Sequence, residues 1–226
     1  AALLAFILKI KLMDPLPYKL KFLFPFIIII PLASFGTYQR NKVWKDNFTL
    51  YKTDIKTVPG SARAQLFFGI ELLNKYYKSK NKIELNQSIE AMETACRINP
   101  DFYHAFYNLG LAYQANDDHQ KAVKAFERVL QIETKHINSH YYLGMSYGKG
   151  FNQFDKAIEF IEKGLKYGYN GADGYVNLGI SYAMKGDLQN ALKAFEKGIT
   201  INPGNANLYL NMGITYDNLG EKEKAK

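Results

Sequence analysis

Two histidines, His136 and His140, have the spacing that most clearly suggests chemistry in this 226-residue sequence. They are four positions apart, so on a helix both imidazoles would share one face and could hold a metal ion. No Glu stands at the position that a zinc-hydrolase motif requires, and no third ligand stands nearby. We therefore expect no metal site, and we interpret His140 as a packing residue.

The sequence shows no catalytic motif of another kind. It contains no Gly-rich phosphate loop and no G-x-S-x-G nucleophile turn. The acidic pair Asp117-Asp118 falls at a predicted turn between helices, where helix capping explains it better than acid–base catalysis. The single cysteine, Cys96, lies on an amphipathic pattern and is expected to be a small buried apolar residue. We predict no catalytic site and no cofactor in this chain.

Three asparagines offer a different chemistry, that of peptide binding. Asn108, Asn177 and Asn211 each stand immediately before a Leu-Gly or Met-Gly pair. A side-chain amide both donates and accepts, so a row of such residues could hydrogen-bond the backbone of an extended peptide without reading its sequence. Tyr142 interrupts the row. The alternative is that these asparagines merely cap or solvate a groove.

Two tyrosines, Tyr107 and Tyr141, each precede a position of this row by one residue. We predict that they point into the same groove and act as contact anchors for a bound peptide.

A repeat must position these residues. Gly110, Gly144, Gly179 and Gly213 recur with a nearly constant period of about 34 residues, and a Tyr follows each of them three positions later. Three positions along a helix make about one turn, so each Gly and its Tyr share a face. Apolar residues with four-residue spacing recur twelve or thirteen positions after each Gly, which predicts a second helix packed on the first.

This pattern resembles the tetratricopeptide repeat over residues 62–226, in period, in the small residue at the helix crossing and in the prolines of Asn99-Pro100 and Asn202-Pro203. The resemblance implies an all-α, right-handed superhelical solenoid of helix hairpins, with each Gly allowing close helix approach. The units are about 62–102, 103–136, 137–171, 172–205 and 206–226. The first carries a seven-residue insertion around Tyr76 to Lys82. The last is truncated, so we expect the natural protein to continue.

Residues 1–39 are predicted to be membrane segments. Phe22 to Phe35 contains no charge, and with its flanks a span of about residues 20–37 is expected; Ala1 to Ile10 would be a truncated earlier span. The alternatives are a buried core helix or a signal-peptide core. Basic residues flank the loop between the two apolar runs, which predicts a cytoplasmic loop and an extracytoplasmic (periplasmic or lumenal) location for everything after Arg40.

The charge distribution argues against nucleic-acid binding. The chain carries a net charge of +8, and residues 1–61 account for +6 of it, with nine basic and three acidic groups. Residues 62–226 hold 20 basic and 18 acidic groups and are nearly neutral. A nucleic-acid binder usually spreads its basic residues over the folded surface.

A connector, residues 40–61, joins the two parts. Trp44, Phe48, Tyr51 and Ile55 have helical spacing, which predicts one helix that packs on the first repeat and ends at Pro59. The connector resembles that of the transmembrane and tetratricopeptide-repeat protein O-mannosyltransferases. The matching residues are Arg40, Asn41, Trp44, Asp46, Leu50, Pro59, Ser61 and Ala62.

That resemblance implies that the chain is the non-catalytic C-terminal region of a membrane glycosyltransferase, in which the repeats present acceptor proteins. We therefore predict a membrane-tethered module that binds proteins or extended peptides. The alternative is a membrane-anchored scaffold for assembly of a protein complex, with no enzymatic role.

Overall fold

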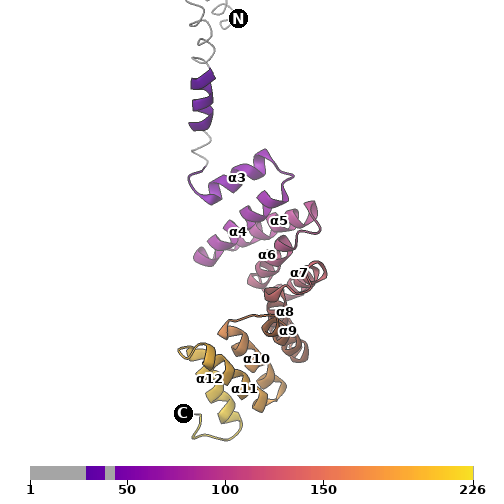
Figure 1. Ribbon diagram of the computed structural model, residues 1–226, viewed down its shortest axis with the longest axis vertical. Coiled ribbons are helices and arrows are strands. Elements are labelled where there is room, and N and C mark those ends of the chain that lie inside the picture. Colours follow the sequence, from indigo (N-terminus) through magenta and orange to yellow (C-terminus); the bar gives the residue numbers. More distant parts are fainter. Residues whose placement is uncertain (1–28, 39–43, 226) are drawn as a thin grey trace, which may run out of the picture. The chain divides into compact units, whose positions relative to one another are not determined.

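The computed structural model describes residues 29–38 and 44–225 (Figure 1). The chain forms two compact units, residues 1–53 and residues 54–226, and each is considered by itself. Ala1 to Ile10, the lysine-flanked loop and residues 20–28 of the expected span lie outside the described residues. Residues 29–38 are helical. Across the two described ranges, no helix combines the length and the apolar content that crossing a membrane requires.

The predicted connector helix is present as α3, Asn47–Thr57. Asp46 caps its start, because its Oδ1 accepts a 2.7 Å hydrogen bond from the backbone N–H of Thr49. The helix ends two residues before Pro59, whose ring fixes φ and removes a backbone donor. Trp44, which the spacing placed on this helix, lies before it and is exposed.

The second unit is all α-helical, as the repeat pattern predicts (Figure 1). Each predicted repeat up to residue 205 contains one pair of antiparallel helices, and a single helix follows. The helices are α4 (Ala62–Ser79), α5 (Lys82–Ile98), α6 (Tyr103–Ala115), α7 (His119–Ile132), α8 (Ile137–Phe151), α9 (Phe154–Lys166), α10 (Ala172–Lys185), α11 (Leu188–Ile201) and α12 (Ala206–Asn218).

Helix boundaries follow from local side-chain chemistry. Asp118 and Asp187 each accept a hydrogen bond from the backbone N–H three residues later and so cap α7 and α11. Asp118 therefore has the capping role predicted for the Asp117-Asp118 pair. At the other end of α11, Asn202 has a non-helical conformation (φ −138°, ψ 87°), in line with the preference of residues before proline, and Pro203 prevents continuation of the helix.

The extra residues of the first repeat lengthen its helices. α4 has 18 residues and α5 has 17, whereas α6 to α12 have 13 to 15. The segment from Tyr76 continues α4 to Ser79, and Lys80 ends that helix in the left-handed conformation (φ 57°). The insertion expected around Tyr76 to Lys82 is thus additional helix joined by a two-residue turn.

The glycines of the repeat lie where paired helices touch. A Cβ atom at Gly110 would stand 2.6 Å from Cε1 of Phe126, and one at Gly179 would stand 2.3 Å from Cε1 of Phe195. Both phenylalanines are fully buried. Only glycine lets these rings lie directly on the first helix of the pair, which confirms the prediction of close approach.

Two layers of helices result. The first helices of successive pairs contact one another, from α4 to α6, α8, α10 and α12. Among the described elements, the second helices α5, α7, α9 and α11 contact first helices and not one another. The first helices therefore form the inner, concave layer of the curved array, and in Figure 1 α5, α7 and α9 follow its opposite edge.

Candidate peptide-binding surface

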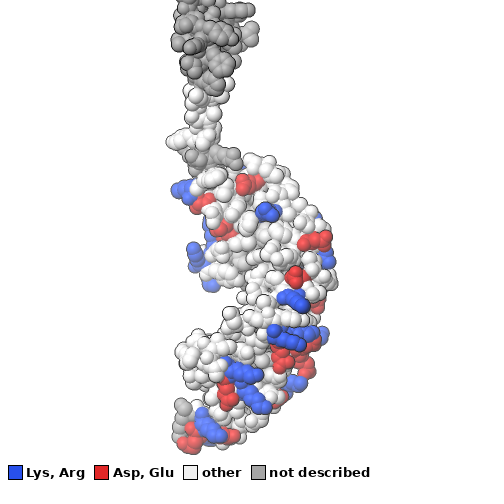
Figure 2. Space-filling view, viewed as in Figure 1, with Lys and Arg blue, Asp and Glu red and all other residues white. Residues whose placement is uncertain are grey.

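The concave layer of residues 62–225 presents a largely uncharged surface. In the orientation of Figure 2, the left edge is hollowed near the middle of the array and shows mainly uncharged atoms. Lysine, arginine and acidic side chains gather along the opposite edge. A ligand on the concave layer would therefore be held by hydrogen bonds and apolar contact more than by ion pairs.

The three asparagines of the predicted row have the same conformation. In each, Nδ2 donates to the backbone carbonyl four residues earlier: Asn108 to His104 at 2.8 Å, Asn177 to Asp173 at 2.9 Å and Asn211 to Asn207 at 2.7 Å. A carbonyl oxygen only accepts, so the amide orientation is fixed by this contact. Within the described residues, Oδ1 of each asparagine has no hydrogen-bond partner and is left as an acceptor.

The preceding repeat also holds Asn177 in place. Its Nδ2 donates to the hydroxyl oxygen of Tyr141 on α8 at 2.7 Å. The hydroxyl of Tyr141 in turn donates to Oδ2 of Asp173 at 2.8 Å, and Tyr169 donates to the same oxygen at the same distance. The rings of Tyr141 and Tyr169 stack with centroids 4.1 Å apart. The central amide of the row is thus fixed by two successive repeats.

Tyr141 does not have the role that the sequence suggests. Its side chain is only 2% exposed, because Tyr169 stacks on its ring and Tyr142 packs against its edge. Burial, with the bond to Asp173, raises the pKa of its hydroxyl well above the ordinary value. Since the ring is covered by the protein itself, Tyr141 positions Asn177 instead of offering a surface to a peptide.

Tyr107 and Tyr142 form an aromatic cluster at the interruption of the row. Tyr107 is half-buried, with its ring 5.0 Å from that of His136 and 6.1 Å from that of Tyr142. Tyr142, which replaces the asparagine, stacks on Phe126 at 5.9 Å. Tyr107 also contacts Phe126, at 6.2 Å, so both tyrosines pack against the core of the helix pair and both stay partly exposed.

Three of the four tyrosines that follow the repeated glycines make a contact that the sequence did not predict. Tyr147 donates to Glu127 at 2.9 Å, and Tyr182 donates to Glu162 at 2.7 Å. Tyr113 donates to Glu93 in the same way. Each bond joins the first helix of one repeat to the second helix of the repeat before it. The constant spacing of twenty residues between Glu and Tyr was the signal available in the sequence.

The two histidines are used by the fold. Nδ1 of His136 accepts from the backbone N–H of Ser139 at 3.2 Å and so caps α8. His140 is buried, and its Nε2 lies 2.9 Å from the carbonyl oxygen of Thr134. No group of three potential metal ligands occurs in the part of the chain that the structure describes. His140 is a packing residue, as the sequence predicts.

Comparison with known proteins identifies the repeat. The sequence pattern of the tetratricopeptide repeat matches residues 103–136 and 172–205, and a second pattern of that description matches residues 194–226. Tetratricopeptide repeats are therefore present at residues 103–136 and 172–226 of this helical array. The two complete matches coincide with the helix pairs α6/α7 and α10/α11.

Three curated proteins share sequence with these tetratricopeptide repeats. Anaphase-promoting complex subunit 3 of Schizosaccharomyces pombe is 26% identical over 110 residues, which cover 48% of this chain and 16% of that protein. The TPR repeat-containing protein MJ1428 of Methanocaldococcus jannaschii is 30% identical over 135 residues, which cover 57% of this chain and 22% of that protein. A UDP-N-acetylglucosamine–peptide N-acetylglucosaminyltransferase of Giardia intestinalis is 26% identical over 98 residues, which cover 41% of this chain and 6% of that protein. The chain thus spans less than a quarter of the length of each of these relatives.

Solved structures share this fold. The crystal structure of MamA superposes with a TM-score of 0.61 at 24% identity, over 66% of this chain and 86% of MamA. The TPR protein YrrB superposes with a TM-score of 0.62 at 22% identity, over 77% of this chain and 86% of YrrB. At these identities the likeness establishes a tetratricopeptide-repeat solenoid.

Proposed function

We propose that the tetratricopeptide-repeat array binds an extended polypeptide along its concave layer, with Asn108, Asn177 and Asn211 as the residues that contact the peptide backbone. The observation that carries this proposal is the shared conformation of the three amides. Each Nδ2 is held by the preceding turn of its own helix, and each Oδ1 is left without a partner in the described residues. An oriented acceptor of this kind suits a peptide N–H.

Two further features support a peptide as the ligand. Tyr107, which is partly exposed, would add a partly apolar contact beside Asn108. YrrB, whose fold this array shares, is described as a TPR protein with an unusual peptide-binding site. The ligand would be recognised mainly through its backbone, because the concave layer carries few charges (Figure 2).

Binding can be tested with a fluorescein-labelled, unstructured 20-residue peptide of Ala, Ser and Thr, titrated with the 226-residue chain. Replacing Asn177→Ala together with Asn211→Ala removes two acceptors, so we expect about tenfold weaker binding with unchanged helical content. Asn218→Ala is the matched control, because that residue is exposed at the end of α12. Equal affinities for the double variant and the control would contradict the proposal.

For the parent protein, we infer a membrane glycosyltransferase in which the repeats present acceptor polypeptides on the extracytoplasmic side. The O-mannosyltransferase-like connector supports this inference, as does the distant relative from Giardia, an enzyme that transfers N-acetylglucosamine to peptides. Topology is testable with Met184→Cys, an exposed position, in a Cys96→Ala background. A membrane-impermeant maleimide should label intact cells or vesicles from the extracytoplasmic side. Labelling only after lysis would reverse the orientation.

A membrane-anchored scaffold without enzymatic role is the second candidate. It is favoured by the relative from Schizosaccharomyces pombe, which is a subunit of a multiprotein complex. The sequence that flanks residues 1–226 in the gene distinguishes the two. Further membrane spans with paired acidic residues in an early outer loop would support the transferase, and their absence would favour the scaffold.

A further inference from the structure

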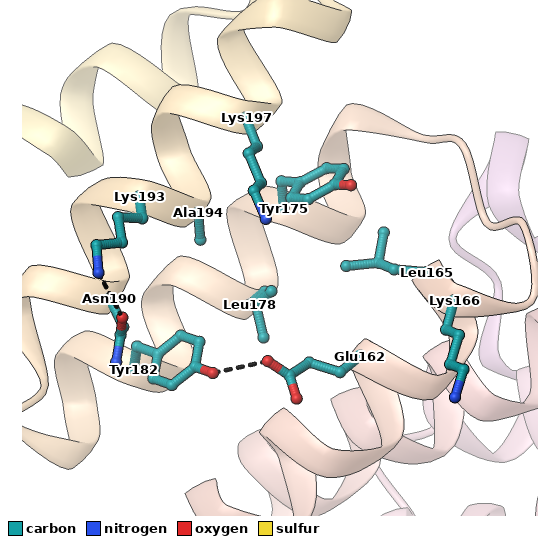
Figure 3. A pocket seen from close by; sticks show the side chains of 10 residues that line it. All are labelled: Glu162, Leu165, Lys166, Tyr175, Leu178, Tyr182, Asn190, Lys193, Ala194 and Lys197. Atoms are coloured by element: carbon teal, nitrogen blue, oxygen red, sulfur yellow. Dashed lines mark hydrogen bonds between the residues drawn. The ribbon is translucent and has the colours of Figure 1, made fainter.

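A hollow of about 510 Å³ lies among α9, α10 and α11, away from the asparagine row (Figure 3). Leu165, Leu178 and Ala194 lie in the middle of it, and Tyr175 and Tyr182 stand beside them. We call this site the α11 hollow. Tyr175, Leu178 and Tyr182 are three and four residues apart and so share one face of α10. Asn177 lies on another face of α10, so a ligand in the α11 hollow would bind at a site separate from the asparagine row.

The same hollow recurs two repeats earlier. A smaller one of about 210 Å³ is lined by residues that each lie 69 positions before a residue of the α11 hollow. They are Phe106, Leu109, Tyr113, Lys121, Lys124 and Ala125. The ring of Phe106 there is covered by the guanidinium of Arg128, 5.9 Å from the ring centroid. The hollow is therefore a property of the repeat, and its size depends on the individual side chains.

In the repeat between them, the protein fills this position with its own phenyl ring. Phe160 stands where the other two repeats have Ala125 and Ala194. Its ring packs nearly parallel to His140 and to Tyr147, at centroid distances of 6.2 and 5.7 Å. His140 and Tyr147 are the counterparts of Tyr175 and Tyr182. Phe160 thus shows which side chain fits the space that Ala194 leaves open.

Charges distinguish the filled position from the open one. Lys163 lies 5.2 Å over the ring of Phe160 and pairs with Glu159 at 2.6 Å. In the open hollow the counterpart of Lys163 is Lys197, and the counterpart of Glu159 is Lys193. With Lys166, three exposed lysines therefore line the α11 hollow, and none of them forms an ion pair within the described residues. The one acidic residue that lines the hollow, Glu162, accepts a hydrogen bond from the hydroxyl of Tyr182.

We propose that the α11 hollow binds the phenylalanine side chain of a partner polypeptide that carries acidic residues next to that phenylalanine. The ring would take the place that Phe160 takes in the neighbouring repeat. The partner's carboxylates would form ion pairs with Lys193 and Lys197, as Glu159 does with Lys163. Apolar burial supplies affinity, and the lysines select an acidic partner over a basic one.

The probe for this proposal is a fluorescein-labelled peptide, Gly-Ser-Glu-Asp-Phe-Asp-Glu-Ser-Gly, titrated with the 226-residue chain. Replacing its phenylalanine by alanine should weaken binding about tenfold or more, because the ring's apolar area stays in water. Ala194→Phe should abolish binding by filling the hollow as Phe160 does. The matched control Ala125→Phe fills the smaller hollow and should leave the affinity unchanged.

Lys193→Glu keeps the proposal testable even if Ala194→Phe misfolds, because residue 193 is exposed. It restores the acid found beside Phe160 and should lower affinity several-fold at low salt. Exchanging the peptide's phenylalanine for benzoylphenylalanine should yield photo-crosslinks to α10 and α11 beside Ala194. Crosslinks to the asparagine row would overturn this proposal and leave the concave-layer function standing. No binding of the peptide at millimolar concentration would overturn it as well.

Discussion

The hydroxyl of Tyr147 donates a 2.9 Å hydrogen bond to Oε1 of Glu127, which lies twenty residues earlier on the second helix of the preceding repeat. Burial, together with the Glu127 carboxylate, raises the pKa of Tyr147 to about 12. The same pair recurs as Tyr113 with Glu93 and as Tyr182 with Glu162. These bonds join successive repeats, whereas the glycine contacts act inside each repeat.

Tyr147→Phe should destabilise the array by about 0.5–1.5 kcal/mol, because the half-buried Glu127 loses a donor. Urea denaturation followed by circular dichroism measures the change. Tyr209→Phe is the control, since that hydroxyl lies on an exposed side chain and its loss should be silent. A double-mutant cycle with Glu127→Gln should show coupling between the two sites, and strictly additive effects would contradict the assignment.

Gly179→Ala should cost about 1–3 kcal/mol, because the new Cβ would stand 2.3 Å from the buried ring of Phe195. Gly204→Ala makes a matched comparison, since its nearest neighbour, Oδ1 of Asn202, is 3.6 Å away. We expect the second change to stay within about 0.5 kcal/mol. Similar midpoints for the two variants in thermal unfolding would refute the close-approach argument.

Lowering the pH should weaken the array through His136 and His140. Burial lowers the pKa of both imidazoles in the folded state, so the unfolded chain binds protons more readily. Stability present above about pH 6.5, the ordinary histidine value, is therefore lost as the pH falls through that value toward the lower folded-state pKa. The urea midpoint should be lower at pH 5.5 than at pH 7.5.

Variants with residues taken from other repeats test whether the two imidazoles cause this pH dependence. His136→Asn keeps an N-cap, as Asn205 caps α12, and His140→Phe introduces the residue found at the equivalent position 106. The double variant should lose part of the pH dependence between 5.5 and 7.5. An unchanged pH profile would mean that other groups dominate.

Cys96 should resist alkylation in the folded protein. It is 8% exposed, and burial raises the pKa of its thiol to about 12, so the reactive thiolate is scarce at pH 8. Iodoacetamide should modify it only after unfolding in urea. Mass spectrometry of the native and the unfolded chain distinguishes the two states.

The repeats and their packing could be predicted because both depend on spacing along the chain. The period located Gly110 and Gly179, and a helix crossing at each required a bulky partner on the second helix of the pair. Tyr141 escaped prediction because the residues that bury and bind it belong to the next repeat and its link. Tyr169 lies in the link before α10, and Asp173 lies in the first turn of α10, and neither position is part of the repeated Gly–Tyr pattern. The α11 hollow could not be predicted because a single alanine, Ala194, belongs to no recognisable motif. Its role becomes visible only when the structure shows Phe160 filling the equivalent position of the preceding repeat.

The division between glycine contacts within repeats and Tyr–Glu bonds between them has a mechanical consequence. Pulled from its two ends, the array should bend first at the joints between repeats. Hydrogen bonds such as that from Tyr182 to Glu162 can open there while Phe195 stays packed on Gly179. The second unit would then extend elastically, with the helix pairs as rigid segments. Its curvature could change to match the length of a bound polypeptide.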